Sequence, residues 1–196
     1  MEEALGRGRA GQPALNASLL LFDFLVGHVA RDRERYAPVI ANAARLLAAA
    51  RASGLMVAHA RADHRPGSHA DTLHDSGPRA PLIMGGTPEA EIVPELAPLP
   101  GEHQVLKLRW SAFHGTELHR ALRARGVDTI MLCGGSTEIG ISSTAYAARD
   151  LDYNLVIVAD ACTSAKQDVH EQLMREVFPR LARVRTTMRV LEMIQP

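Results

Sequence analysis

Two charged side chains lie within or directly after apolar runs of this chain, and they are the first candidates for chemistry. Asp23 follows the run Leu19–Phe22 and precedes Phe24, so its neighbours in the sequence are apolar. Such a carboxylate is either a cap for a turn or helix, or a general acid or base tuned by its pocket. Lys107 lies inside another apolar run, where an unpaired ammonium would be costly. It either faces outward from an edge strand or is buried as the partner of Asp23.

A glycine-rich segment at residues 134–140, Gly-Gly-Ser-Thr-Glu-Ile-Gly, joins a predicted strand to a predicted helix. Glycines allow close backbone approach there, and a helix N-terminus presents N–H groups to an anion. The segment lacks the Gly-Lys-Ser/Thr of a P-loop and the spacing of a dinucleotide fingerprint. An ordinary tight turn and a ligand-binding loop both remain open interpretations.

A histidine-rich loop raises the question of a metal, because Asp63, His64, His69 and His74 follow one another closely. Their spacing does not place two ligands on one face of a regular element, so solvated loop histidines are the better interpretation. We assign no metal site and expect no cofactor. The sequence assigns no role to the loop at residues 59–74.

The elements that must position these residues alternate apolar, strand-like runs with helical periodicity. Strands are predicted at 19–22, 55–60, 105–108, 129–133 and 155–159, with a short strand and a final helical turn within 184–194. Helices are predicted from Pro38 to Gly54 and over 116–125, 137–151 and 168–181, where Pro179 should bend or end the last one. The predicted fold class is α/β, a three-layer Rossmann-like sandwich with a mostly parallel central sheet flanked by helices.

Ligands of open parallel sheets bind beyond the carboxyl ends of the strands. This rule gathers Asp23, Arg61, His64, Lys107 and the segment 134–140 into one candidate pocket. Residues 65–101 form a long excursion between strands, and such excursions are usually functional or poorly ordered.

Composition sets outer limits on the function. A chain of 196 residues, 46% of them apolar, can bury one substantial core, so we expect a flexible tail or arm at residues 1–16 and one domain at 17–196. Its 22 basic and 22 acidic side chains cancel, which favours neither nucleic acid nor an anionic membrane. The apolar runs are too short to span a bilayer, and the first residues do not resemble a signal peptide. Cytoplasm is the expected location.

The two cysteines, Cys133 and Cys162, both follow apolar strand-like runs. This favours buried thiols in a reducing compartment, with a disulfide between them as the alternative.

Several segments resemble the isochorismatase-like hydrolases. Residues 107–113, Lys-Leu-Arg-Trp-Ser-Ala-Phe, resemble the Lys-x-Arg-Tyr/Trp-Ser-Ala-Phe segment of the isochorismatases. Residues 134–145 look like the superfamily motif Gly-x-x-Thr-x-x-Cys-x-x-x-Thr-Ala, with Gly140 at the cysteine position.

Further along, residues 158–161 and 168–170 are similar to the family's Val-Ala-Asp-Ala and Asp-x-His elements, and Asp23 matches the catalytic aspartate. The resemblance extends over nearly the whole chain from Ser18.

For the cysteine members, the resemblance implies amide hydrolysis by an Asp-Lys-Cys triad, a route that Gly140 closes here. Isochorismatases proper also carry glycine at this position. They use the aspartate as an acid that protonates a vinyl ether carbon, after which water attacks the resulting cation. Carried over, Asp23 is the proton donor, Lys107 orients or tunes it, and the backbone N–H near Gly140 binds a substrate carboxylate or carbonyl.

The resemblance also implies substrate contacts, at Arg61, Trp110, Ser136, Thr137 and Ile139. A guanidinium at position 61 suits a bidentate carboxylate contact, so the expected substrate is a small anionic molecule. Leu25, Ser136 and Glu138 replace polar or pocket residues of true isochorismatases, which weakens isochorismate as the substrate.

The leading interpretation is an isochorismatase-family hydrolase that acts on a small carboxylated substrate without a cysteine nucleophile. An ether or vinyl-ether bond is favoured over an amide C–N bond. The alternatives are an amidohydrolase of the same superfamily and a catalytically silent small-molecule-binding homologue. The resemblance further implies a homo-oligomer, a dimer or tetramer, with no nucleic-acid or membrane partner.

Overall fold

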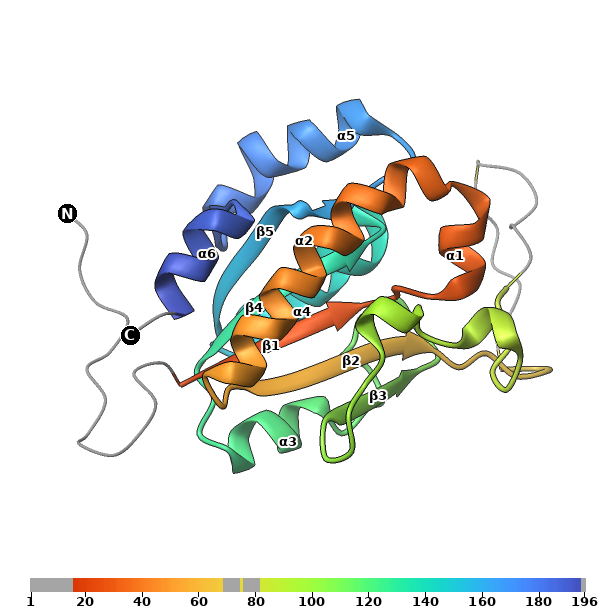
Figure 1. The fold of residues 1–196 in the computed structure, drawn as a ribbon, viewed down its shortest axis with the longest axis horizontal. Helices are drawn as coiled ribbons and strands as arrows, with labels where there is room; N and C mark the ends of the chain where they lie inside the picture. Colours follow the sequence, from red (N-terminus) through yellow and green to blue (C-terminus); the bar gives the residue numbers. More distant parts are fainter. Residues whose placement is uncertain (1–15, 69–74, 76–81, 195–196) are drawn as a thin grey trace.

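A computed structural model describes residues 16–68, 75 and 82–194 of the chain (Figure 1). Its centre is a six-stranded sheet in the order β3-β2-β1-β4-β5-β6, with every neighbouring pair parallel. The strands are β1 (Ala17–Phe22), β2 (Met56–Ala62), β3 (His103–Lys107), β4 (Thr129–Gly135), β5 (Asn154–Thr163) and β6 (Arg183–Arg185). The prediction of a parallel α/β sheet is confirmed.

Helices cover both faces of this sheet and give the molecule its three layers. Figure 1 shows α2 (Arg33–Ala52) in front of the sheet and α4 (Ser142–Asp150) behind it. A third helix, α6 (Thr187–Ile194), packs against α2 and β5. The remaining helices are α1 (Val26–Arg31), α3 (Leu118–Ala124) and α5 (Gln167–Gln172).

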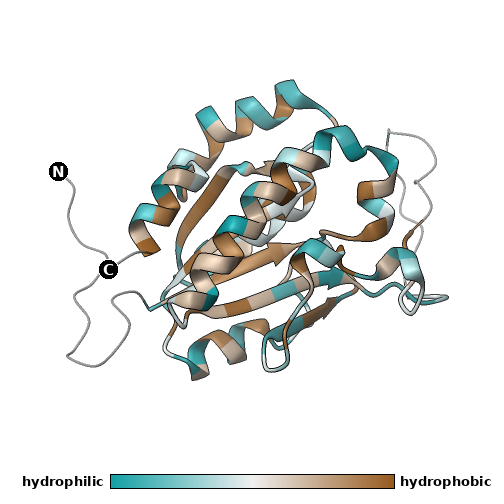
Figure 2. Cartoon of the chain, in the orientation of Figure 1, coloured by the Kyte–Doolittle hydropathy of each residue, from teal (hydrophilic) through white to brown (hydrophobic). Residues whose placement is uncertain are grey.

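The central strand β1 is buried along its whole length, as its continuous apolar run predicts. Figure 2 shows hydrophobic residues concentrated in the central strands, whereas hydrophilic residues lie mainly on the helices and loops. From β1 the chain moves outward to β2 and β3, then returns to place β4 on the other side of β1. The strand order therefore reverses between β1 and β4, and ligand sites of such sheets lie at the carboxyl ends of strands around this point.

The helix α2 begins at Arg33 rather than near Pro38, because Asp32 caps it. The Asp32 carboxylate accepts a hydrogen bond from the backbone N–H of Arg35 at 3.1 Å, which satisfies one of the donors that a helix start leaves unpaired. Pro38 is accommodated inside the helix. The buried residues recur at helical spacing, at Tyr36, Val39, Ile40, Ala43, Leu46, Leu47 and Ala50.

Other predicted boundaries moved by a few residues. Strands β2 and β5 continue beyond their predicted ends, and α6 is a helix of eight residues rather than one final turn. Pro179 lies in a 3-10 turn, Phe178–Arg180, so the prediction that it ends the preceding helical segment is confirmed. Within the described residues, no helix is long and apolar enough to cross a membrane.

The long excursion is partly described. It contains two 3-10 turns, Pro88–Ala90 and Pro94–Leu96, and an antiparallel bridge ties Ile92 to Leu25. Residues 69–74 and 76–81 of this excursion lie outside the described residues, as do residues 1–15 of the predicted tail.

Candidate active site

Asp23 stands directly after β1, with its backbone in the left-handed region at φ 52°. Non-glycine residues adopt this conformation at a cost, and such strain is often found at functional sites. Two backbone hydrogen bonds hold it: the Asp23 N–H donates to the Ala60 carbonyl at 2.8 Å, and the Asp23 carbonyl accepts from the Leu25 N–H at 2.8 Å.

Asp23 is 8% exposed, and its carboxylate has two donors within the described part of the chain. Its Oδ1 accepts from the backbone N–H of Ala62 at 2.9 Å, and its Oδ2 accepts from Lys107 Nζ at 2.7 Å. The following helix α1 has Leu25 at its N-cap position, with no side-chain cap. Asp23 is therefore not a helix cap, and the charged pair is the correct interpretation.

Lys107 is the last residue of β3 and belongs to an edge strand, yet it is only 3% exposed. Ala62 is its register partner on the intervening strand β2, and the lysine side chain extends across this strand to Asp23. Burying both charges is tolerable because each neutralises the other.

The Lys107 ammonium also faces an aromatic ring. Its Nζ lies 4.4 Å from the centroid of the Phe22 ring, within the range of a cation–π interaction. Phe22 immediately precedes Asp23 and is 1% exposed, so the carboxylate and the ring hold the ammonium from two sides.

The loop after β4 approaches the end of β1 closely. Gly134 has φ 129°, and a Cβ there would lie 2.8 Å from the carbonyl carbon of Phe22 and closer still to its oxygen. Only glycine fits such a position. A π-helical turn, Thr137–Ile141, follows and leads into α4, and it presses Gly140 against the Phe22 ring. The loop is thus part of the site rather than a remote tight turn.

Asp23, Lys107 and Gly140 are therefore brought together, as predicted, with Phe22 between the last two. The predicted substrate contacts are more dispersed. Ser136 is half-buried, Thr137 is buried and shares a 2.9 Å hydrogen bond with His170 Nδ1, and Trp110 and Ile139 are exposed.

Arg61 lies apart from the charged pair. Its register partner is Leu106, whereas Ala62 pairs with Lys107, so alternation points Arg61 and Lys107 to opposite faces of the sheet. The guanidinium donates to the Ala90 carbonyl at 3.2 Å. Its buried Nε has no hydrogen-bond partner within the described residues.

Two further side chains close to Asp23 were missed from the sequence. Burial lowers the pKa of His28 in α1, and the charge of Asp23 opposes this. Burial raises the pKa of Tyr36 in α2, where Arg35 acts in the opposite direction and Asp23 in the same one. The helix α1 that carries His28 was not predicted, and Tyr36 precedes the predicted start of α2 near Pro38.

The two cysteines of the chain are free and buried, in agreement with the prediction. Burial raises the pKa of the Cys133 thiol well above its ordinary value and that of Cys162 to about 12. Thiolate is the nucleophilic form of cysteine, and burial disfavours this form at both positions.

Among the described residues, no cluster of three His, Cys, Asp or Glu side chains could hold a metal ion. Of the histidine-rich loop, His69 and His74 lie outside the described part of the chain.

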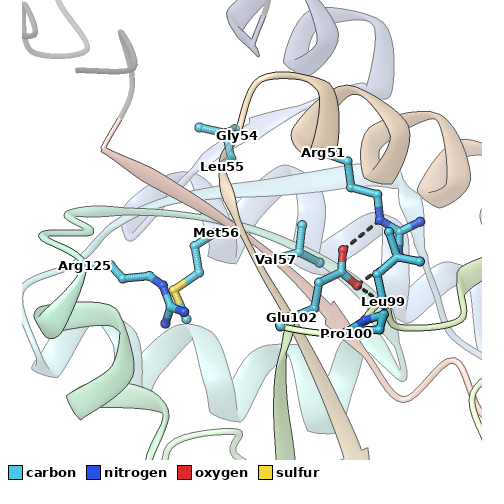
Figure 3. A pocket seen from close by; sticks show the side chains of 10 residues that line it. Arg51, Gly54, Leu55, Met56, Val57, Leu99, Pro100, Glu102 and Arg125 are labelled. Carbon is cyan, nitrogen blue, oxygen red and sulfur yellow. Dashed lines mark hydrogen bonds and ion pairs between the residues drawn. The ribbon is translucent and has the colours of Figure 1, made fainter. Parts of the chain in front are cut away.

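A second ionic cluster lies at the opposite, amino edge of the sheet, beside a cavity of about 440 Å³ (Figure 3). Glu102 accepts from Arg51 Nε at 2.7 Å, from Arg51 Nη2 at 2.9 Å and from the Leu99 N–H at 2.8 Å. His59 Nε2 shares a further 2.9 Å contact with this carboxylate. This cluster was not predicted from the sequence.

The fold and the placed residues define a class: an α/β protein with a buried acid–lysine pair at the carboxyl edge of a parallel sheet. Comparison with known proteins makes the class specific. A model of the isochorismatase domain matches residues 17–189. The chain therefore belongs to the isochorismatase family.

Individual relatives agree with this assignment. The uncharacterized isochorismatase family protein YwoC of Bacillus subtilis is 43% identical over 106 residues, 54% of this chain and 56% of YwoC. Maleamate amidohydrolase of Pseudomonas putida is 30% identical over 175 residues, 86% of this chain and 79% of that protein. The solved structure of an isochorismatase family protein from Burkholderia thailandensis has a TM-score of 0.84 at 30% identity, covering 92% of this chain and 96% of that one. The match to YwoC thus covers little more than half of that relative's length.

Proposed function

We propose that this protein hydrolyses an ether or vinyl-ether bond in a small carboxylated molecule, with Asp23 as general acid and without a cysteine nucleophile. The observation that carries the proposal is the buried Asp23–Lys107 pair, which lies beside Gly140 where the superfamily motif has its cysteine. Both cysteines of the chain are buried elsewhere, in β4 and β5.

In this proposal Asp23 takes up a proton before the reaction and transfers it to the vinyl ether carbon, and the resulting cation is attacked by water. The water returns a proton to Asp23, and the C–O bond then breaks to give a carbonyl compound and an alcohol. The carboxylate left after the first step finds the Lys107 ammonium at 2.7 Å and the Ala62 N–H at 2.9 Å already in place. Preorganised donors of this kind stabilise charge that develops during reaction.

The substrate carboxylate would be bound by backbone N–H groups of the turn that contains Gly140. Arg61 is not included in this anion site, because it points to the opposite face of the sheet from Lys107 and its Nη1 lies 3.7 Å from the Glu91 carboxylate. A homodimer or homotetramer in the cytoplasm remains the expected setting.

The test is turnover of isochorismate and related vinyl-ether carboxylates by the parent protein and by Asp23→Asn, with the carbonyl product quantified. We expect the variant to lose about 10²–10⁴-fold in kcat, the usual contribution of a general acid. Asp150→Asn is the control, because Asp150 is exposed at the end of α4. Equal turnover by parent and Asp23→Asn would exclude the acid role. Turnover that depends on Asp23 would exclude a silent binding homologue.

Amide hydrolysis is a second candidate, supported by the likeness to maleamate amidohydrolase over 86% of this chain. Here Asp23 would act as the base for an attacking water, because both thiols of the chain are buried. Ammonia release from maleamate that survives iodoacetamide treatment would favour this candidate, and its absence from a panel of small amides would weaken it.

A further inference from the structure

The ring of Phe22 occupies the space that any side chain at position 140 would need. A Cβ built on Gly140 would lie 2.7 Å from Phe22 Cζ, 3.2 Å from Cδ1, and closest of all to Cε1. Carbon atoms in contact normally stay about 3.5–4.0 Å apart, near the optimum of their attraction. One edge of the ring thus fills the position from which a cysteine thiol would have to project.

The same ring cannot easily withdraw. Phe22 is 1% exposed, and its carbonyl group is in close contact with Gly134 of the neighbouring strand. Its face lies 4.4 Å from Lys107 Nζ, which is bonded to Asp23. Displacing the ring would therefore disturb the charged pair as well as the packing.

We propose that Phe22 is a positioning residue that fixes this site in its thiol-free form. Its edge excludes a side chain at position 140, and its face holds the Lys107 ammonium against Asp23. Residues 22 and 140 then form a reciprocal pair: a nucleophile at 140 requires a small residue at 22. The inference concerns the packing of the site, so it holds for either bond considered under Proposed function.

The experiment compares four proteins: the parent, Gly140→Cys, Phe22→Val, and Phe22→Val/Gly140→Cys. Valine lacks the three ring atoms that approach position 140. Urea unfolding measures stability, and alkylation by iodoacetamide, read by intact mass, measures thiol access. Cys133 and Cys162 are buried in the parent fold and provide the unlabelled background.

We expect Gly140→Cys alone to lower the folded-to-unfolded ratio by about tenfold or more, because overpacking a tight core is destabilising. In the double variant most of this loss should be recovered, and the introduced thiol should accept one carboxamidomethyl group. An equally stable and equally labelled Gly140→Cys protein would overturn the proposal. So would a double variant that is labelled no faster than the single one.

The pH dependence of alkylation separates positioning from mere space filling. A thiol beside the Lys107 ammonium should ionise below the ordinary cysteine value of about 8.5. Adding Lys107→Met to the double variant should then move its alkylation profile to higher pH, and an unchanged profile would contradict the placement of the ammonium. If the cysteine variants do not fold, the same stability cycle with Gly140→Ala decides the case. Additive effects of Phe22→Val and Gly140→Ala would refute the reciprocal pair.

Discussion

Two ionic clusters lie at opposite edges of the sheet. Glu102, which immediately precedes β3, forms one with Arg51 and with His59 of β2, and Lys107 at the end of β3 forms the other with Asp23. At the amino edge, Glu102 accepts two hydrogen bonds from Arg51, one from the Leu99 N–H and one from His59. A carboxylate has about four acceptor positions, so its hydrogen-bonding capacity is filled. At the carboxyl edge, Asp23 has two donors among the described residues. A carboxylate whose acceptor positions are all hydrogen-bonded stabilises a fold. One with unused acceptor positions can still bind a substrate or a proton. The difference supports the proposal that the active site lies at the carboxyl edge.

The largest expected effect comes from breaking the Asp23–Lys107 pair. Lys107→Met leaves a carboxylate buried without its cation, which typically costs about 3–5 kcal/mol of unfolding free energy. We expect a loss of that size in urea denaturation at pH 7, together with loss of turnover.

A double variant tests the cause of that loss. Asp23→Leu/Lys107→Met removes both charges, and replacing a buried pair by apolar residues is often neutral or stabilising. Most of the stability should return while turnover stays absent. A double variant as unstable as Lys107→Met would show that packing, rather than the unpaired charge, causes the loss.

The corresponding change at the amino edge should be smaller and should not affect turnover. Glu102→Gln keeps the shape but removes the charge that Arg51 contacts at 2.7 Å. Hydrogen bonds to charged groups contribute about 1.5–3 kcal/mol each, so we expect a loss of about 1–3 kcal/mol in urea denaturation with kcat unchanged. A loss of turnover in this variant would remove the functional distinction between the two edges.

The stability difference between the parent and Glu102→Gln should depend on pH. Burial raises the pKa of Glu102, but hydrogen bonds from Arg51, the Leu99 N–H and His59 outweigh it and lower this pKa from 4.5 to about 2. A depressed pKa in the folded state stabilises the protein above the unfolded value and loses this effect as pH falls. The stability difference between the parent and Glu102→Gln should therefore be full above pH 4.5 and shrink towards pH 2. A difference that is constant over this range would contradict the low pKa.

The smallest effect is expected at Asp32, which caps α2 near the carboxyl edge but is not bonded to the charged pair. Asp32→Ala should cost about 1 kcal/mol, the usual value of an N-cap, with turnover retained. Asp32→Asn should cost less, because asparagine is an equally good cap. Thermal unfolding of both variants measures the difference.

The sheet could be predicted well from the sequence because its strands are continuous apolar runs. Each predicted strand is present, and β1 is buried throughout as its composition requires. The start of α2 could not be placed, because the charged stretch around Asp32 resembles a loop until its capping bond is seen. For the same reason α1, a short helix just before this cap, was missed.

The site was only partly predictable, because its decisive contacts join distant parts of the chain. Asp23 and Lys107 were each left with two interpretations. Their 2.7 Å contact across β2 shows that Lys107 is buried as the partner of Asp23, whereas the acid–base role of Asp23 stays a prediction. Phe22 was simply the last apolar residue of a strand, and its importance depends on contact with Gly140. Arg61 aligned with a substrate-binding position, yet strand alternation turns it to the other face of the sheet.

The position of Lys107 on an edge strand has a consequence for local opening of the molecule. Within the described chain, β3 is hydrogen-bonded only to β2, so it should detach more readily than the central strands. Each detachment would pull the ammonium away from Asp23 and leave a buried carboxylate alone. The charged pair should therefore oppose the detachment of β3 from the sheet. Slow amide hydrogen exchange along β3, faster in Lys107→Met, would report this effect.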